Sequence, residues 1–387
     1  MSYDFVVVGA GIAGASSAYH LKKSGASRVL LLDRGDAASG GTGKSAAIMR
    51  QSYSTPLLVR LARQSMLMLA CAKDELGKDG GYVKAGYCFL YSDDMLEGAK
   101  RNVAMQKSLG IVNEWREGCA FPEHLPEINP EGIAAIVYEP DGGYTDPVQA
   151  TEAYVHGFRA LGGEFKPRTP ARRLLHDGKR IAGVVTEDRD IRAGVTINAA
   201  GPWAKPLAES AGLEMPMRCV REQDTVWEAS RGRNIPTTSI SNGVDAIYIR
   251  PLGERRYIIG RGFPKQYFDV DPYNYKQSAD EDFISDVQTR MVHRFPAFTG
   301  MKLLEAYAAL YDVTPDWYPF VGPRTGIAGY ADFCGGSGHG FKIAPAIGKE
   351  LVDWLVTGKA ARDFRQFSHD RVAAGKLFVQ SFGGNRG

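Results

Sequence analysis

The sequence predicts a mixed α/β and α+β fold, in which an α/β domain is assembled from separated segments and a β-rich domain is inserted into it. The chain has 387 residues, which is long enough for two domains. Both ends follow a strand, glycine turn and helix pattern, at residues 5–25 and 326–358, which is typical of α/β domains. Around residues 218–265 the pattern is instead that of short antiparallel strands with polar turns.

The expected elements follow in chain order. Residues 5–8 are an apolar run typical of a strand buried on both faces, residues 15–25 suit a helix that Gly25 ends, and residues 28–33 form the next strand. Residues 3–33 are therefore one βαβ unit. We further expect a long amphipathic helix at 55–75, a strand at 86–93, a helix and turn at 148–165, three short strands at 171–201, a hairpin at 246–262, a helix at 278–296, and a strand, glycine loop and helix at 326–358.

Composition and charge argue against several classes of function. Hydrophobic residues make up 44% of the chain, charged residues 24%, and the net charge is +3, so neither nucleic acid nor an anionic membrane is expected as the main partner. The five cysteines and seven histidines are scattered, without CxxC or HExxH, so we expect neither a metal site nor a disulfide framework. The N-terminus lacks the pattern of a signal peptide or a membrane span, and we expect a cytoplasmic protein.

The first motif with chemical meaning is VVVGAGIAG, which contains Gly9, Gly11 and Gly14. In this pattern the first glycine makes a tight turn, the second lets the backbone approach a pyrophosphate, and the third lets the helix pack on the strand. Asp33 ends the second strand, at the place where an acid accepts a ribose hydroxyl. The sequence therefore predicts binding of a dinucleotide with an unphosphorylated ribose, either NAD or FAD.

A second loop, SGGTGKSAAIMRQ at residues 39–51, looks at first like a phosphate-binding P-loop. A P-loop requires a glycine five places before the glycine of its GK pair, and Ala38 stands at that place. The loop is therefore out of register for an ATPase or a GTPase. Another role must explain its small residues and the arginine that follows them, Arg50.

Several stretches together resemble one family. They are the two loops above, NAAGPWA at residues 198–204, and ALYDVTPDWYPFVGP with GGSGHGFKIAP at residues 309–323 and 335–345. The chain is similar to the D-amino-acid oxidase and sarcosine oxidase superfamily of FAD-dependent amine oxidoreductases, which includes sarcosine oxidase beta subunits and bacterial D-amino-acid dehydrogenases. The resemblance implies a glutathione-reductase-like FAD-binding (Rossmann) domain at residues 1–80, 145–220 and 325–387, and an inserted antiparallel-sheet substrate domain at residues 81–144 and 221–324.

The resemblance also implies roles for individual residues. Arg50 and Lys342 correspond to residues that bind the substrate carboxylate, and Tyr311 to an active-site aromatic residue. A structural ion pair, a solvated lysine and a core tyrosine are the alternative interpretations of these three. Ala309 and a histidine-free first loop stand where some relatives attach FAD covalently, so non-covalent FAD is expected. The expected FAD-binding residues are Gly9, Gly11, Ile12, Ala13, Gly14, Asp33, Arg34, Gly41, Thr42, Gly43, Ser45, Ala46, Ala171, Ala200, Gly201, Trp203, Gly336, Ser337, Gly338, His339, Gly340 and Lys342.

The implied reaction is the oxidation of an amino acid, either D-configured or carrying an N-methyl or other secondary amine. A hydride passes from the carbon that bears the nitrogen to flavin N5, and the resulting imine hydrolyses. Two alternatives stay open: oxidation of a 2-hydroxy acid on the same scaffold, and a flavin subunit that is active only within a hetero-oligomer. A small-molecule substrate is expected for each, and the sequence is compatible with either a homo- or a hetero-oligomer.

Overall fold

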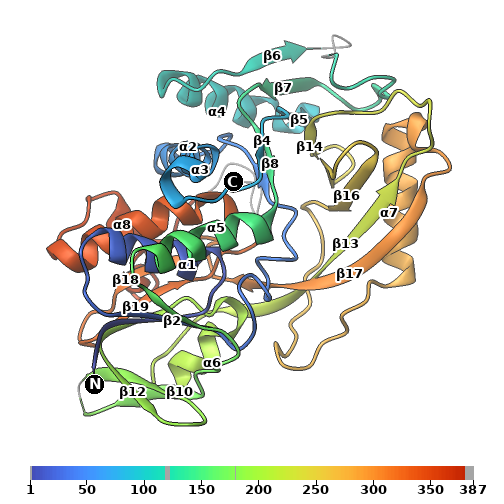
Figure 1. Ribbon diagram of the computed structural model, residues 1–387. Helices are drawn as coiled ribbons and strands as arrows, with labels where there is room; N and C mark the ends of the chain where they lie inside the picture. The colour runs from blue at the N-terminus through green and yellow to red at the C-terminus, as the bar shows by residue number, and fades with distance from the viewer. Residues whose placement is uncertain (1, 118–122, 179, 380–387) are drawn as a thin grey trace.

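The computed structural model describes residues 2–117, 123–178 and 180–379 (Figure 1), so Cys119 lies outside the described residues. The described strands form two eight-stranded sheets and one small three-stranded sheet. No helix in this part of the chain is long and apolar enough to cross a membrane. The same residues contain no cluster of His, Cys, Asp and Glu side chains that could hold a metal ion.

The first sheet is built around the apolar run near the N-terminus. Val6, Val7 and Val8 are buried in β1, which pairs in parallel with β2 on one side and β12 on the other. Both faces of a parallel sheet must be shielded from water. The helices α1, α5 and α8 pack on one face of this sheet (Figure 1). The strands of this sheet are β1 (Tyr3–Val8), β2 (Val29–Leu32), β9 (Glu164–Lys166), β10 (Arg173–His176), β11 (Ile181–Val185), β12 (Asp190–Asn198), β18 (Phe320–Pro323) and β19 (Tyr330–Cys334), and the main helices around it are α1 (Ile12–Lys23), α5 (Pro147–Ala160), α6 (Ala204–Glu209) and α8 (Ala344–Thr357).

The second sheet is antiparallel except where β5 and β14 run in parallel. Side chains alternate along β5, so that Cys88 and Leu90 join the apolar cluster beneath α7, while Tyr87 and Phe89 join the cluster beneath α4. One helix therefore covers each face. In spatial order the strands are β17 (Lys302–Val313), β13 (Arg218–Glu228), β16 (Arg256–Arg261), β15 (Ile247–Pro251), β14 (Ser239–Asn242), β5 (Tyr87–Tyr91), β7 (Ala135–Glu139) and β6 (Glu114–Glu117), and the helices are α4 (Leu96–Ser108) and α7 (Glu281–Arg294).

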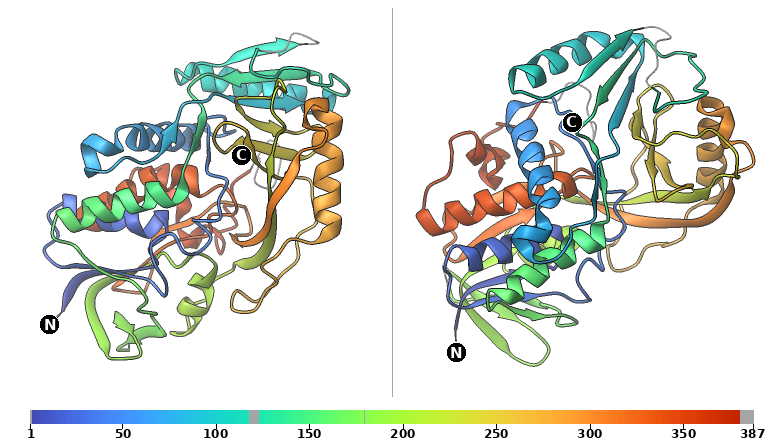
Figure 2. Two further views of the ribbon diagram at one scale, coloured as in Figure 1. Left: turned by 45° about the vertical axis from the view of Figure 1, so that its right-hand side comes forward. Right: turned by 45° about the horizontal axis from the view of Figure 1, so that its top comes forward.

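Two long strands link the sheets. β13 and β17 pair along almost their whole length, and Figures 1 and 2 show both strands reaching from the second sheet toward the first. The small sheet of β3 (Ile48–Met49), β8 (Gly143–Thr145) and β4 (Tyr82–Val83) makes a second connection. The expected architecture of an α/β domain with an inserted antiparallel sheet is confirmed, and the proposed domain boundaries stay a prediction.

One local expectation is wrong, and one helix was not expected. The helix expected at 55–75 is two helices, α2 (Pro56–Ala70) and α3 (Ala72–Leu76), because the chain turns at Cys71 and α3 packs against α5. The sequence reading also missed α4, whose polar composition obscures the narrow buried face formed by residues such as Ala99 and Val103. The other expected helices, strands and hairpins lie where the sequence places them, within a few residues.

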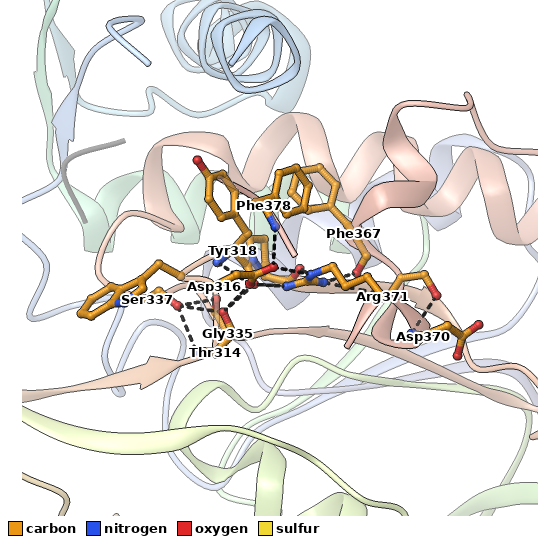
Figure 3. A network of polar contacts seen from close by, with 12 residues as sticks. Thr314, Asp316, Tyr318, Gly335, Ser337, Phe367, Asp370, Arg371 and Phe378 are labelled. Atoms are coloured by element: carbon orange, nitrogen blue, oxygen red, sulfur yellow. Dashed lines mark hydrogen bonds and ion pairs between the residues drawn. The ribbon is translucent and has the colours of Figure 1, made fainter. Parts of the chain in front are cut away.

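The C-terminal segment is fastened to the core by a buried ion pair between Arg371 and Asp316 (Figure 3). Arg371 Nε and Nη2 donate to the two carboxylate oxygens of Asp316 at 2.7 and 2.8 Å, in a fork geometry that suits a carboxylate. Two residues earlier, the Thr314 hydroxyl donates to the Tyr318 carbonyl at 2.7 Å, and the Thr314 N–H donates to the Ser337 hydroxyl at 3.2 Å. The ion pair thus connects the C-terminal turn to the glycine loop that contains Ser337.

We expect Arg371→Ala to lower the free energy of unfolding by about 3–5 kcal/mol, because it removes the cationic partner of the buried Asp316 carboxylate. Urea unfolding followed by circular dichroism, with excess cofactor present, measures this loss. Arg168→Ala is the control, since Arg168 pairs with Asp36 on the surface and should shift the midpoint little. Equal shifts for the two variants would contradict a special role for the buried pair.

Candidate functional site

A cavity of about 1070 Å³ is lined by residues of both large sheets. This volume exceeds the usual range of about 300–1,000 Å³ for a single small-molecule pocket. From the first sheet come the turn after β1, the loop at 39–50, the segment at 199–207 and the glycine loop before α8. From the second sheet come residues of β5, β13, β14, β15 and β17. The cavity can therefore hold a large cofactor against the first sheet and a small substrate against the second.

The glycine turn after β1 allows backbone contacts that no other residue would permit. Gly9 has φ +104°, and a Cβ atom there would lie 2.3 Å from the Ala199 carbonyl oxygen. A Cβ atom at Gly11 would lie 2.7 Å from Thr42 Oγ1, and one at Gly14 would lie 1.8 Å from the Gly9 carbonyl oxygen. Gly9 and Gly11 line the cavity, whereas Gly14 holds α1 against β1 behind it. The N-terminus of α1 consequently faces the cavity, where it favours phosphate groups.

Asp33 both fixes this turn and lines the cavity. Its Oδ2 accepts a hydrogen bond from the Ala10 N–H at 2.6 Å, and its Oδ1 accepts one from the Gly35 N–H at 2.8 Å. Each carboxylate oxygen has a second lone pair, so the group can still accept a ribose hydroxyl. Burial raises the pKa of this carboxyl, and the two backbone donors oppose that shift.

Trp203 and Arg34 form a second part of the wall near Asp33. The Arg34 guanidinium lies 4.7 Å from the centroid of the Trp203 ring and 5.6 Å from that of Tyr273. The indole Nε1 of Trp203 is buried and has no hydrogen-bond partner among the described residues. A buried donor without a partner is costly, so this N–H is available to a bound ligand.

The loop at 39–50 forms the third part of the wall and is not a P-loop. Its lysine, Lys44, donates to the Ala308 carbonyl at 2.9 Å and so contacts the middle of β17. Gly43 does not line the cavity, because it packs on Ala38 instead. A Cβ atom at Gly43 would lie 2.3 Å from the Ala38 carbonyl oxygen. The expected residues of this loop that do line the cavity are Gly41, Thr42, Ser45 and Ala46.

The glycine loop before α8 presents its glycines to the cavity and keeps its side chains behind them. Ser337 and His339 were expected to bind the cofactor, but neither lines the cavity. The Ser337 side chain is buried against Thr314, and His339 Nε2 lies 2.6 Å from the Trp317 carbonyl, to which it donates. Burial, together with Lys342, lowers the pKa of His339 to about 3, so its ring is neutral at physiological pH. Both residues therefore support the loop from behind.

Three expected substrate-binding residues, Arg50, Lys342 and Tyr311, line the same cavity. Arg50 is 4% exposed, and its guanidinium stacks 4.5 Å from the Tyr53 ring centroid and donates to the Ser52 carbonyl. Lys342 is 9% exposed, so it is not a solvated surface lysine. Its ammonium has no hydrogen-bond or carboxylate partner among the described residues. Burial, and secondarily the charge of Arg50, holds the pKa of Lys342 well below its usual value.

Tyr311 lies against the glycine loop. A Cβ atom at Gly338 would lie 2.3 Å from Tyr311 Cε2, so the ring packs directly on the backbone there. Of the expected residues, the structure brings these to the cavity wall as well: Ile12, Ala13, Ala171, Ala200, Gly201, Gly336 and Gly340.

Apart from Tyr311 in β17, sequence reading missed the part of the wall that the second sheet contributes. Asp224, Tyr248 and Phe89 line the cavity, and each comes from a different strand. The one available signal was the alternation of charged residues in β13, where Glu222 and Asp224 share a face that a simple sheet would bury. The pairing of strands far apart in the chain decides which of these faces reaches the cavity.

The family model described as "DAO: FAD dependent oxidoreductase" matches residues 4–354. The chain belongs to this family. The DAO assignment accounts for the glycine turn, the acid at the end of β2 and the long loop in one site. FAD is therefore the cofactor, and the residues present fit it: a glycine cradle for the pyrophosphate, an acceptor in Asp33, and a free buried donor in Trp203.

Relatives and solved structures resemble the chain over nearly its whole length. It is 26% identical to sarcosine oxidase subunit beta of Arthrobacter sp, covering 97% of this chain and 92% of that one. It is 25% identical to 4-methylaminobutanoate oxidase (formaldehyde-forming) of Paenarthrobacter nicotinovorans, covering 94% of this chain but 45% of that protein. The chain thus spans less than half the length of this relative, and 41% of human mitochondrial sarcosine dehydrogenase.

Among solved structures, L-proline dehydrogenase from P. horikoshii is 25% identical and superposes with a TM-score of 0.89, over 97% of this chain and 99% of that one. Glycine oxidase from Bacillus cereus ATCC 14579 superposes with a TM-score of 0.79 at 20% identity, over 94% and 97% of the two chains. The second of these supports the fold alone.

We predict that the FAD of the DAO protein is bound without a covalent link. Ala309 lines the cavity, and the cavity-lining residues that the structure describes include no histidine. Their only cysteine, Cys334, is buried in β19, where burial raises the pKa of the thiol well above its usual value. Acid precipitation should release all the flavin into the supernatant, as measured by its absorption spectrum. Flavin that stays in the protein pellet would show that a covalent link exists.

Proposed function

We propose that this protein oxidises an amino acid that is either D-configured or carries an N-methyl or other secondary amine. The observation that carries the proposal is the pair of buried cations, Arg50 and Lys342, in the wall of an FAD-family cavity. A buried ammonium without a partner is unfavourable unless a bound anion compensates it. A substrate carboxylate is such an anion, and it would place the adjacent carbon and nitrogen beside the glycine loop.

The names of the relatives support an amino-acid substrate. Sarcosine oxidase subunit beta and 4-methylaminobutanoate oxidase are named for N-methylated amino acids, and L-proline dehydrogenase is named for a cyclic secondary one. Each of these substrates carries a carboxylate and an amine. The same two groups are those that the cavity wall is suited to hold.

In the proposed mechanism, Arg50 and Lys342 bind the carboxylate and orient the substrate. Their positive charges also lower the pKa of the nearby substrate amine, which favours the neutral form that must react. Tyr311 packs on the backbone of Gly338 and helps to exclude water from the reacting carbon. Bound FAD supplies the hydride acceptor for the hydrogen on the carbon that bears the nitrogen. The amine proton is lost to solvent, and the imine product hydrolyses in water.

The decisive experiment is anaerobic mixing of the yellow protein with a panel of amino acids, N-methyl amino acids and 2-hydroxy acids, followed by absorption spectroscopy. Bleaching of the flavin by amino acids but not by hydroxy acids supports the proposal. Bleaching only by hydroxy acids would replace it with 2-hydroxy-acid oxidation on the same scaffold.

A second candidate follows from the beta-subunit relative, which the chain matches over 92% of its length. The protein could supply the flavin site of a hetero-oligomer and turn over only with its partner subunits. Bleaching of the isolated protein at a rate that supports full turnover would eliminate this candidate.

We predict that Arg50→Ala raises the KM for a carboxylate substrate by about 10- to 150-fold, since a charge-assisted hydrogen bond contributes about 1.5–3 kcal/mol. Lys342→Ala should have a smaller effect, because an ammonium holds an anion as a point charge. The loss of binding free energy in the double variant should be smaller than the sum of the losses in the two single variants, since the two cations share one partner. Steady-state kinetics measure these effects, and an amine without a carboxylate is the control. Equal losses on both kinds of substrate would argue that the cations serve the cofactor instead.

We also predict that Lys342→Met makes the FAD-loaded, substrate-free protein more stable at neutral pH, while it weakens substrate binding. Methionine fills a similar volume without a charge that must be desolvated. Because the pKa of Lys342 is depressed on folding, this side chain binds more protons in the unfolded chain, and its unfavourable contribution to wild-type stability should diminish as pH rises toward about 10. The advantage of the methionine variant should therefore shrink over that window. Thermal unfolding at several pH values tests this, and a destabilised variant would contradict it.

A further inference from the structure

Asp224 is a buried carboxyl that faces the cavity and that the proposed mechanism does not use. Its side chain is 5% exposed, and it lines the cavity from β13. The Tyr248 hydroxyl donates to Oδ1 of Asp224 at 2.5 Å. Among the described residues no other group donates to this carboxyl, so Oδ2 has no partner. A buried carboxylate oxygen in this condition is suited to a ligand that carries a hydrogen-bond donor or a positive charge.

The contact between Asp224 and Tyr248 is built by the sheet. In register, Asp224 in β13 lies opposite Gly260 in β16, and Gly260 lies opposite Tyr248 in β15. A Cβ atom at Gly260 would lie 2.3 Å from Asp224 Oδ1 and 2.4 Å from the Tyr248 hydroxyl oxygen. Glycine at this position therefore lets the tyrosine cross the middle strand and reach the carboxyl. The contact depends on glycine in the middle of this row of three residues, because any larger residue there would separate the side chains of Asp224 and Tyr248.

The surrounding charges leave Asp224 without a cation of its own. Lys265, whose charge acts on Asp224, forms a buried ion pair with Glu222 and donates to the Arg261 carbonyl at 2.8 Å. Two carboxyls thus share one ammonium. Burial raises the pKa of Asp224 to about 7, with Glu222 acting in the same direction, while the hydrogen bond from Tyr248 and the charge of Lys265 oppose it. A bound cation would supply the missing charge.

The position of Asp224 separates it from the carboxylate end of the cavity. Tyr311, which packs on the glycine loop, pairs with Val220 in β13, and Asp224 lies four residues further along the same strand. Residues spaced by an even number share a face, and four residues of strand span about 13 Å. Asp224 therefore lies on the same wall as Tyr311 but well away from the glycine loop. A ligand that touches both ends must be longer than the smallest amino acids.

We propose that Asp224 and Tyr248 form a subsite for a positively charged nitrogen at the far end of the substrate. This inference rests on the proposed function, since it takes the carboxylate of the same molecule to be held by Arg50 and Lys342. The substrate class is then an amino acid that carries a second, cationic group on its side chain. The cavity would match that molecule in charge, with cations at the glycine loop and an anion on the second sheet.

The test uses pairs of amino acids of equal length that differ at the terminal group, such as lysine against 2-aminoheptanoic acid and ornithine against norleucine, each as both enantiomers. Binding is measured anaerobically through perturbation of the flavin spectrum, and turnover through bleaching. The wild-type holoenzyme should bind the cationic member of a pair about ten- to a hundredfold more tightly. Asp224→Asn should remove most of that preference, and Tyr248→Phe should reduce it, with neutral members little changed.

Tyr307→Phe is the matched control, because Tyr307 lies opposite Asp224 in β17 but does not line the cavity. It should leave the preference unchanged. If Asp224→Asn loses its FAD, Tyr248→Phe still tests the subsite. A wild-type enzyme without preference, or an Asp224→Asn variant that weakens neutral and cationic members equally, would overturn the inference. Failure of every amine to bleach the flavin would overturn the proposed function instead, while the spectral binding titration would still report on the subsite.

Discussion

The architecture of the site depends on backbone lying directly against backbone. Where α1 crosses β1, Gly14 packs directly on the carbonyl of Gly9. Even one methyl group at Gly14 would clash with that carbonyl. The same condition recurs across the cavity, where a Cβ atom at Gly340 would lie 2.7 Å from the Gly336 Cα atom. Such close packing brings the N-terminus of a helix and an exposed turn to the cofactor, which side chains would otherwise keep away. The rest of the cavity is arranged around these two contacts.

The glycine loop before α8 is held from behind by a chain of polar contacts. Asp316 receives Arg371 from the C-terminal segment, Thr314 meets Ser337, and His339 donates to the Trp317 carbonyl. These side chains are buried, so each lost partner would leave a desolvated polar group. The loop keeps its small residues toward the cavity because its polar side chains are engaged on the other side. The conformation of this loop therefore depends on residues that do not line the cavity.

Charge is distributed unevenly along the cavity wall. The end nearest the glycine loop holds Arg50 and Lys342, both buried, while the second sheet contributes Asp224 with its tyrosine partner. Desolvating cations at one end and a carboxyl at the other is unfavourable in the empty protein and favourable with a ligand of complementary charge. This cost in stability is the physical basis of the proposal that these side chains bind the substrate, because a core built for stability alone would replace them with apolar residues.

The sequence by itself determined the β1–β2 part of the first sheet and its binding of a dinucleotide, whereas the choice of FAD over NAD came from the resemblance. Gly9, Gly11, Gly14 and Asp33 are close in the chain, and their chemistry depends on local turns that short-range sterics dictate. Arg50, Lys342 and Tyr311 were reached only through resemblance, and Ser337 and His339 were assigned to the cofactor although their side chains point elsewhere. Only the tertiary structure decided the opposite wall. Asp224, Gly260 and Tyr248 meet because three strands pair in one register, and no local pattern in the chain records that pairing.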